Sequence, residues 1–421
     1  MRVISINVFE HQPVPLPPAL DNDRIRRRLV RAGRSELGPA LKLDQKRLTA
    51  TGLVGLVSTP SVQIQILPKV YEAEDASVAR GMQFLQATFP LALAGRFGSG
   101  KAYAASSSDR IIDIILAYFL ARLAELISWE FPRSYFEVTE LRDSLAGRVD
   151  LNSLASRMPG TMRGVMVRHA PLQADNNTSR LCRAVVEESM TKAHDGKLIW
   201  QARQLQSLLS DVRSVPLSVE LIEGAKAEVR SADWEWLFTL ANLLVKQRTS
   251  NPWEAGGEAG LGILYRIEHL FEKAVRLALA RGIERKCGGT VRKDGLGCVL
   301  RTADGGSFVN LKPDLIIHLG SGQLLGDSKW KRLRSLADPV PAENDLYQIL
   351  TYSRAANVAK CFIIYPLGRP HSDVVVKNVY EAFAGAVKVA VLQVDILQLL
   401  QTDPGLRASA EDKLAAVVAS I

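Results

Sequence analysis

The stretch KPDLIIHLGSGQLLGDSKW, Lys312–Trp330, decides the fold of the C-terminal part of the chain. Two apolar runs flank a Gly-Ser-Gly turn, a pattern that predicts a β-hairpin. Side chains alternate along a strand, so Asp327 and Lys329 fall on one face of the second strand and Ser328 falls on the other. The turn folds the strand that follows Asp314 back against the strand that carries Asp327. The hairpin therefore predicts two converging carboxylates.

Converging carboxylates suit a hard cation such as Mg²⁺ or Mn²⁺, and the backbone carbonyl of Ser328 is the expected further oxygen ligand. Such a metal generates hydroxide from water and neutralises charge on a phosphate under attack. Lys329 lies one pleat beyond Asp327, where an ammonium orients the nucleophile or stabilises the added negative charge. The alternative for Asp314, Asp327 and Lys329 is a surface hairpin with charged ends, because Asp-x-Lys alone is common by chance.

A helix is predicted before the hairpin, over Ile263–Gly282, and its C-terminal glycine is typical of a helix end. Glu268 and Glu272 lie four residues apart on one face of this helix, so one of them is expected to face the sheet edge as a third acid. The spacing leaves open which of the two serves the site. Either one is also consistent with a solvated helix residue.

A second helix is predicted after the hairpin, from Asn344 to about Ala356. It places Gln348 and Tyr352 on consecutive turns of one face. Both are expected to reach the phosphate or the attacking water. The alternative is that they are ordinary polar helix positions.

The order of predicted elements divides the chain into three segments. Residues 1–80 are β-rich, with a hairpin over 51–70, and residues 81–255 are mainly helical. Residues 256–421 read as helix, strands, helix, strand, which predicts a central mixed sheet flanked by helices. The Gly-rich loop NPWEAGGEAGLG, residues 251–262, marks the clearest boundary.

Composition limits the class of protein. The 421 residues are 47% hydrophobic and 23% charged, as in a folded globular protein, and the net charge of +9 favours a polyanionic partner. The most apolar stretch, residues 111–127, is interrupted by Asp113, Arg122 and Glu125, which argues against a membrane span. Four cysteines without a Cys-x-x-Cys pair and the absence of a signal peptide predict a cytoplasmic protein.

The segment GRFGSGKA, Gly95–Ala102, imitates a phosphate-binding loop. The hydroxyl that such a loop uses for Mg²⁺ is replaced by Ala102, and the residues that follow lack the required helix pattern. No nucleotide is therefore expected to bind to this chain itself.

Several motifs together resemble a known family. Pro313-Asp314, Asp327-Ser328-Lys329 and Gln348-x-x-x-Tyr352 match the PD-(D/E)xK nuclease pattern, and the chain as a whole resembles the McrC family, the nuclease subunits of McrBC-type modification-dependent (5-methylcytosine) restriction systems. The resemblance covers nearly the whole chain and is looser in the middle. It also rests on VGLVSTPSVQIQILPKV near the N-terminus, LAGRVDL at 145–151, the LFEKAV helix with Glu272 in the family's acidic position, and DNNTSRLCRAV at 175–185, where Ser179 replaces the usual asparagine.

The resemblance implies a multidomain α+β or α/β protein whose C-terminal domain is restriction-endonuclease-like. It implies a Mg²⁺-dependent DNA endonuclease of an anti-phage restriction complex that cuts when docked on a hexameric McrB-like AAA+ GTPase or NTPase, whose hydrolysis it stimulates. The alternative is a non-catalytic activator of such a ring. The double-stranded DNA is expected to be modified or phage DNA.

The resemblance also assigns roles to residues. The catalytic set is expected to be Asp314, Asp327, Lys329, Glu272, Gln348 and Tyr352, with the metal held by Asp314, Asp327, Glu272 and the Ser328 carbonyl. The N-terminal segment is expected to dock on the motor, and its contacts are expected to include Arg24, Arg27, Arg28, Arg31 and Lys69. The alternatives for the arginines are contact with DNA phosphate or an ordinary solvated helix face.

Overall fold

The computed structural model describes residues 4–35, 38–59, 61–72, 77–97, 110–129, 133–135, 137–145, 147–152, 164–229, 231, 234–248, 261–293, 295–296, 298–301, 307–333 and 340–421. The chain divides into two compact units, one from Met1–Ile115 with Ser250–Ile421 and the other from Leu116–Thr249. The predicted domain boundaries at residues 80 and 255 stay a prediction. Residues 251–260 of the predicted boundary loop and 98–102 of GRFGSGKA lie outside the described residues.

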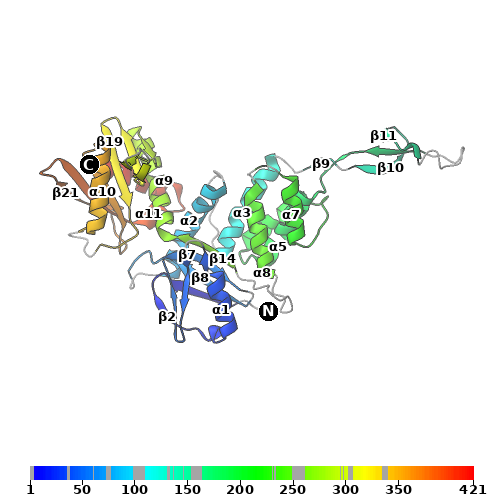
Figure 1. Ribbon diagram of the computed structural model, residues 1–421, viewed down its shortest axis with the longest axis horizontal. Coiled ribbons are helices and arrows are strands. Elements are labelled where there is room, and N and C mark those ends of the chain that lie inside the picture. Colours follow the sequence, from blue (N-terminus) through cyan, green and yellow to red (C-terminus); the bar gives the residue numbers. More distant parts are fainter. Residues whose placement is uncertain are drawn as a thin grey trace. The chain divides into compact units, whose positions relative to one another are not determined.

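The first unit contains a four-stranded sheet whose strands come from segments far apart in the sequence. Its order is β1-β8-β7-β14, from Ile4–Phe9, Val62–Leu67, Leu53–Ser58 and Leu261–Arg266. The predicted hairpin forms as β7 and β8, which pair antiparallel, and β1 adds to β8 in parallel. In Figure 1 the green β14 lies beside the blue β7, although the two are far apart in sequence.

The strand β14 corrects the prediction of a helix from Ile263 to Gly282. Residues Leu261–Arg266 form a strand because they find a partner in β7, and the helix α9 begins only at Ile267. The helix also continues to Cys287 and ends at Gly288, which adopts the left-handed conformation with φ 60°. Gly282 lies inside α9, at a position where a Cβ atom would collide with the backbone of α12.

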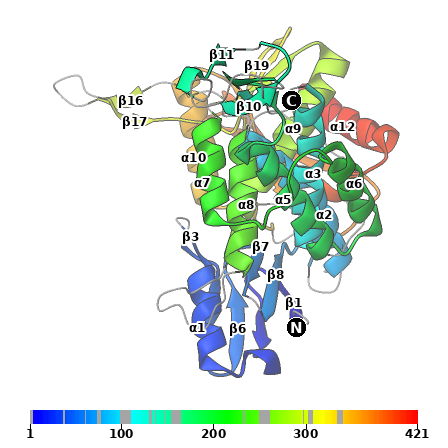
Figure 2. The ribbon, with the colours of Figure 1, turned by 90° about the vertical axis from the view of Figure 1, so that its right-hand side faces the viewer.

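Around this sheet the N-terminal residues build a small module, shown at the bottom of Figure 2. The helix α1 (Asp23–Ala32) is capped by Asn22, whose side chain accepts from the backbone N–H groups of Arg24 and Ile25. Leu29 anchors the helix in the module's apolar core. The remaining elements are β2 (Pro13–Pro15), β6 (Arg47–Ala50) and β5 (Leu41–Leu43) in one sheet, the pair β3 (Arg34–Ser35) and β4 (Gly38–Pro39), and the short helix η1 (Pro18–Leu20).

The C-terminal residues of the same unit form a six-stranded mixed sheet, as predicted. Its order is β15-β18-β19-β20-β22-β21, from Thr290–Arg292, Leu315–Leu319, Gly322–Ser328, Lys360–Pro366, Val387–Val394 and Val375–Ala382. β19, β20 and β22 run parallel, and the other neighbours pair antiparallel. A separate pair is formed by β16 (Cys298–Arg301) and β17 (Ser307–Asn310).

Helices cover this sheet. The helix α10 (Glu343–Ala356) buries Ile349 and Tyr352 against Leu325 of β19 and Ile363 of β20. The long helices α9 (Ile267–Cys287) and α12 (Pro404–Ala419) pack on each other and contact β19 and β21. The helices α2 (Val78–Phe97) and α11 (Ile396–Leu399) complete this layer through contacts with α9. The architecture is thus a mixed α and β fold with several sheets.

The second unit is mainly helical. Its helices are α3 (Ile111–Trp129), whose first turn belongs to the first unit, α5 (Asn177–Lys192), α6 (Gly196–Leu208), α7 (Val219–Glu228) and α8 (Glu235–Arg248). Its strands are β9 (Ser134–Tyr135), β10 (Val138–Arg142), β11 (Arg148–Val149), β12 (Val165–His169) and β13 (Leu172–Gln173). Among the helices described, none combines the length and apolarity that a membrane crossing requires.

Candidate functional site

The hairpin of the opening stretch forms with the predicted register. Leu315 at the start of β18 lies opposite Gly326 of β19, so Asp314 comes to lie at the end of β19 where Asp327 and Ser328 are found. The Asp314 carboxylate accepts two hydrogen bonds from Ser328, one from the backbone N–H at 2.9 Å and one from the hydroxyl at 2.8 Å. Ser328 therefore fixes the Asp314 carboxylate beside the strand that carries Asp327.

Asp327 is the most buried acid of the hairpin, with 2% of its surface exposed. Its Oδ2 atom lies 2.6 Å from the ammonium nitrogen of Lys329, which projects from the same face. Burial raises the pKa of Asp327 to about 6, and the nearby charge of Asp314 adds to the rise while Lys329 opposes it. The negative charges of the two carboxylates thus repel each other, and a cation bound between them would reduce this repulsion.

Lys329 is held in place from the other side by α10. Its ammonium donates to Oε1 of Gln348 at 2.8 Å, and the Gln348 amide donates to the Tyr352 hydroxyl at 2.6 Å. Burial opposes the charge of Lys329, but the carboxylates of Asp327, Asp345 and Asp314 raise its pKa on balance. Lys329 is therefore a charged group with a fixed direction.

The chain of contacts ends at Tyr352, the residue one turn after Gln348. Its hydroxyl donates to the backbone carbonyl of Lys312 at 3.4 Å, two residues before Asp314. Burial raises the pKa of Tyr352, so the phenol stays protonated and can donate this bond. Gln348 and Tyr352 thus connect α10 to both strands of the hairpin.

Asp345 is a further acid near the site that the sequence analysis missed. It is 4% exposed, its charge contributes to the raised pKa of Asp327, and Lys331 and Tyr365 bind its two oxygens at 2.6 and 2.8 Å. The signal in the sequence was its place one turn before Gln348, on the helix already singled out. Its carboxylate supports the charge of the Lys329 ammonium from the protein side.

Neither glutamate of α9 joins the two aspartates through a contact among the described residues. Glu272 is buried and forms ion pairs with Arg276, at 2.9 Å, and with Lys293. Glu268 is exposed and adds to the raised pKa of Glu10 in the N-terminal module. Burial favours Glu272 over Glu268 as a functional acid, but its role at a metal stays a prediction.

Trp330, the residue after Lys329, ties the hairpin to the rest of the unit. Its ring lies between Phe84 of α2 and Phe271 of α9, with centroids 5.5 and 5.3 Å away. Its indole N–H donates to Oε1 of Glu10 at 2.9 Å. Burial raises the pKa of Glu10, and the bonds from Trp330 and from the backbone N–H of Lys69 oppose the rise. The strand that carries Lys329 is therefore fastened to the N-terminal sheet.

A second fastening uses Arg332 and the residues after β8. The Arg332 guanidinium donates to the backbone carbonyls of Lys69 and Tyr71, and the Tyr71 hydroxyl donates to Asp395 at 2.6 Å. Lys69 thus takes part in this junction through its backbone. Its predicted role in partner contact is a separate matter and stays a prediction.

The donors of the hairpin fit a hard cation. Two carboxylates, of Asp314 and Asp327, share one edge, and oxygen ligands of this kind suit Mg²⁺. Within the described ranges no three His, Cys, Asp or Glu side chains gather into one metal-binding group. A cation at this edge would rest on the two aspartates with backbone or solvent oxygens, and the Ser328 carbonyl stays a predicted ligand.

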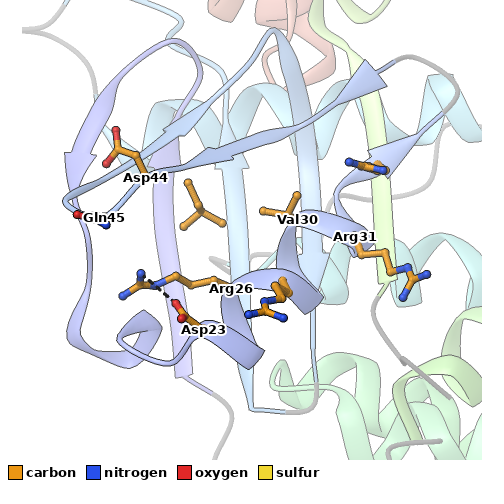
Figure 3. Close-up of a pocket in the computed structure, with 9 residues that line it drawn as sticks. Asp23, Arg26, Val30, Arg31, Asp44 and Gln45 are labelled. Carbon is orange, nitrogen blue, oxygen red and sulfur yellow. Dashed lines mark ion pairs between the residues drawn. The ribbon is translucent and has the colours of Figure 1, made fainter. Parts of the chain in front are cut away.

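The arginines predicted to contact the partner lie on α1, and two of them, Arg27 and Arg31, border a hollow of about 580 Å³. We call it the arginine hollow; its lining residues are Asp23, Arg26, Arg27, Val30, Arg31, Arg34, Leu43, Asp44 and Gln45. Figure 3 shows Asp44 and Gln45 on the turn that faces the helix with Arg26 and Arg31. Arg24 and Arg28 lie on the same helix but do not line the hollow.

Comparisons with known proteins show which family and which solved structures this chain resembles. The family model described as McrBC 5-methylcytosine restriction system component matches residues 48–366. No curated protein matches the chain. The chain is similar to one in the refined half-complex from the tetradecameric assembly of Thermococcus gammatolerans McrB AAA+ hexamers with bound McrC, with a TM-score of 0.60, 16% identity, and coverage of 98% of this chain and 99% of that one.

A second match is to the cryo-EM structure of the Thermococcus gammatolerans McrBC complex. Its TM-score is 0.44 at 17% identity, with coverage of 66% of this chain and 88% of that one. At these identities the likeness of the half-complex chain shows a shared fold, and it extends over nearly the full length of both chains.

Proposed function

This chain belongs to the family of McrBC 5-methylcytosine restriction system components, as its sequence motifs predicted, and we propose that it is the nuclease subunit of such a system. The observation that carries the proposal is the edge formed by Asp314, Asp327 and Lys329, where two carboxylates and an ammonium converge at the end of a hairpin. This set and its order match the PD-(D/E)xK pattern of metal-dependent nucleases.

The proposed reaction is hydrolysis of a DNA phosphodiester. Asp314 and Asp327 would hold Mg²⁺, which when bound supplies charge neutralisation at the phosphate and a more acidic water. The protein's share is to hold both carboxylates in place at one edge of the hairpin. Ser328 does this for Asp314 through two hydrogen bonds, and Lys329 does it for Asp327.

Lys329 is proposed to act on the nucleophile and on the phosphate. Its ammonium is charged, partly buried and directed by Gln348, so it is ready to hold an attacking water or to stabilise negative charge that develops on a phosphate oxygen. Gln348 and Tyr352 are proposed to position Lys329. Gln348 contacts the Lys329 ammonium directly, and Tyr352 holds Gln348.

The proposed partner is an AAA+ ring. In the similar solved structure McrC is bound to McrB AAA+ hexamers, and we propose that this chain docks on a motor of that type and stimulates its hydrolysis. A subunit that only activates the ring is not favoured. Burying Asp327 and Lys329 beside a second acid costs free energy, and a purely structural hairpin would gain more from apolar residues at these positions.

The test is cleavage by the complex reconstituted from this chain and its AAA+ partner. Asp327→Ala and Lys329→Ala are each expected to lower cleavage by roughly a hundredfold or more, because each removes a charge that acts in the transition state. Cleavage is followed on plasmid DNA with Mg²⁺ and nucleotide, and hydrolysis by the motor is measured in the same samples. Motor hydrolysis is expected to stay near the level of the unaltered complex.

Matched controls come from exposed residues of the same domain. Lys360→Ala on β20 and Asp373→Ala remove the same charges away from the hairpin edge and are expected to leave cleavage unchanged. If Asp327→Ala and Lys329→Ala cut DNA as fast as these controls, the nuclease assignment is wrong. The chain would then be an activator of the ring only.

A further inference from the structure

We propose that the arginine hollow of the N-terminal module binds the backbone phosphates of double-stranded DNA. The proposal deepens the proposed function, on which it rests for the identity of the substrate. It assigns DNA, rather than the motor, to the arginines that line the hollow.

Positive charge is concentrated in this part of the chain. Residues 21–50 carry nine Lys and Arg against four Asp and Glu, an excess of five within a chain whose whole net charge is +9. The described residues of this segment form α1 and the strands around it, so the excess is gathered on one module. A concentration of this kind is the electrostatic footprint of a polyanion site.

The arginines that line the hollow differ in whether neighbouring groups of the protein already bind their guanidinium groups. Arg26 donates to the Leu20 carbonyl at 2.7 Å and pairs with Asp21 and Asp23 at 3.1 and 3.4 Å, so it stabilises the start of α1. Figure 3 shows its ion pair with Asp23. Within the described part of the chain, Arg27 and Arg34 are exposed and their side chains have no such partner.

Asp44, on the opposite side of the hollow, forms no ion pair with Arg27 or Arg34 among the contacts of the described residues. Asp44 accepts from the backbone N–H groups of Lys46 and Arg47 at 2.9 and 2.6 Å, and these bonds lower its pKa. Its carboxylate closes the turn after β5. The guanidinium groups of Arg27 and Arg34 are left for a ligand.

The kind of lining favours a DNA backbone over a nucleotide. Among the described residues that line the hollow none is aromatic, so they supply no platform on which a base could stack. Arg27 and Arg34 lie seven residues apart and both line the hollow, so they offer two separate guanidinium groups to one DNA strand. An arginine fork matches phosphate oxygens in a bidentate way. A row of such groups fits an extended polyanion better than a single phosphate cluster.

The lining also argues against a protein partner at this place. Protein interfaces usually have a buried apolar or aromatic centre. The apolar residues among its described lining are Val30 and Leu43, both partly buried, and the other lining residues are charged or polar. Its contribution to binding would therefore come from charge, as in non-specific contact with DNA.

The position of the hollow explains what such binding would achieve. It belongs to the same compact unit as the Asp314–Asp327 edge, and this unit is fastened internally by Glu10 with Trp330 and by Arg332 with the residues after β8. A duplex held at the hollow is thus held by the body that carries the candidate catalytic groups. Phosphate contacts would supply affinity without sequence preference.

The test is binding of the full chain to a fluorescent 30-base-pair duplex in EDTA, measured by anisotropy at several salt concentrations. Arg27→Ala combined with Arg34→Ala is expected to weaken binding roughly tenfold at low salt, and to lower the slope of log affinity against log salt by about 1 to 2, as loss of one or two phosphate contacts requires. Methylated and unmethylated duplexes are expected to behave alike.

The matched control is Arg24→Ala combined with Arg28→Ala, which removes the same charge from α1 outside the hollow. It is expected to weaken binding far less. Arg27→Lys combined with Arg34→Lys keeps the charge and is expected to restore most of the affinity, which separates the role of charge from a folding defect. Circular dichroism confirms that each variant is folded.

Two outcomes would overturn the proposal. Equal losses in both alanine pairs would show a diffuse charge effect without a site at the hollow. Unchanged duplex binding together with lost capture of the AAA+ partner would make the hollow a protein contact. Because EDTA prevents cutting, weaker binding in the Arg27 and Arg34 pair would stand even if Asp327→Ala still cut DNA, so failure of one proposal does not imply failure of the other.

Discussion

At the scale of the residue, the candidate site depends on a glycine as much as on its charges. Gly326 precedes Asp327 on β19 and lies beside Phe362 of the neighbouring strand β20. A Cβ atom on Gly326 would collide with the Phe362 ring. Because Gly326 has no side chain, the Phe362 ring of β20 can lie against β19 at this position. This packing fixes the position of the neighbouring Asp327.

We therefore expect Gly326→Ala to damage the site although it removes no charge. Overpacking of this kind costs about 1 to 3 kcal/mol of the free energy of unfolding, and the shift of β19 is expected to lower cleavage as well. Urea unfolding and the cleavage assay measure the two effects.

Gly320→Ala is the matched control, because its Cβ atom would point into open space in the turn of the same hairpin. It is expected to change neither stability nor cleavage by much. Equal stability of the two variants would show that Phe362 yields to the added methyl group at no cost.

At the scale of the element, the start of α5 shows what the residues of DNNTSRLCRAV, 175–185, do in the structure. These residues form one of the motifs that resemble the family. The Asn176 side chain accepts from the backbone N–H and the hydroxyl of Ser179, at 2.8 and 2.9 Å, and so caps the helix. Asp175 binds the Arg180 guanidinium through both oxygens, at 2.7 and 2.8 Å. Ser179 replaces the family's asparagine and still serves the cap.

The Asp175 pair predicts a dependence of stability on pH. The Arg180 hydrogen bonds lower the pKa of Asp175 from its usual 3.8 to about 2, partly opposed by burial. A lowered pKa in the folded state adds stability above the unfolded pKa, and this contribution is lost as the pH falls from about 4 to about 2. Asp175→Asn is expected to cost about 1 to 2 kcal/mol at pH 7, after allowance for the partial exposure of the pair.

Urea unfolding of the helical unit at a series of pH values measures the effect. The difference between Asp175→Asn and the unaltered protein is expected to shrink below pH 4. Asp211→Asn, an exposed aspartate in the same unit, is the control and is expected to show little difference at any pH. A constant penalty for Asp175→Asn down to low pH would show that shape, rather than charge, is what the substitution removes.

At the scale of the whole molecule, the chain leaves one compact unit, builds a second and returns to the first. The return is made by β14, which pairs with β7. Gly55 of β7 has φ 137° and lies so close to Ile263 that a Cβ atom would collide with its carbonyl. The first unit is therefore complete only when both ends of the chain are present.

Two units with separate cores are expected to unfold in two steps. Gly55→Ala is expected to lower the midpoint of one step, because it disturbs the β7–β14 pairing, and Asp175→Asn is expected to lower the midpoint of the other. Differential scanning calorimetry measures both. A single transition that both variants shift alike would show that the two units unfold as one.

The sequence predicted the parts of the candidate site that depend on local pattern. The hairpin of Lys312–Trp330, its register and the helix with Gln348 and Tyr352 follow from alternation, turn residues and helical spacing. It did not predict that Gln348 would hold Lys329 or that Asp345 would lie close enough to act on Asp327. These contacts join residues from separate elements, and no local pattern records how those elements pack.

The motifs in the sequence predicted the family through their resemblance to it. The sequence by itself also determined the elements that carry these motifs and the charge of the N-terminal module, because periodicity, turn chemistry and charge are properties of neighbouring residues. Only the tertiary structure decided that Leu261–Arg266 is a strand, since its partner β7 lies far away in the sequence. Likewise, only the tertiary structure shows that Glu272 forms ion pairs with Arg276 and Lys293, and that Trp330 donates a hydrogen bond to Glu10. The physical reason is that pairing and burial depend on which surfaces meet in space.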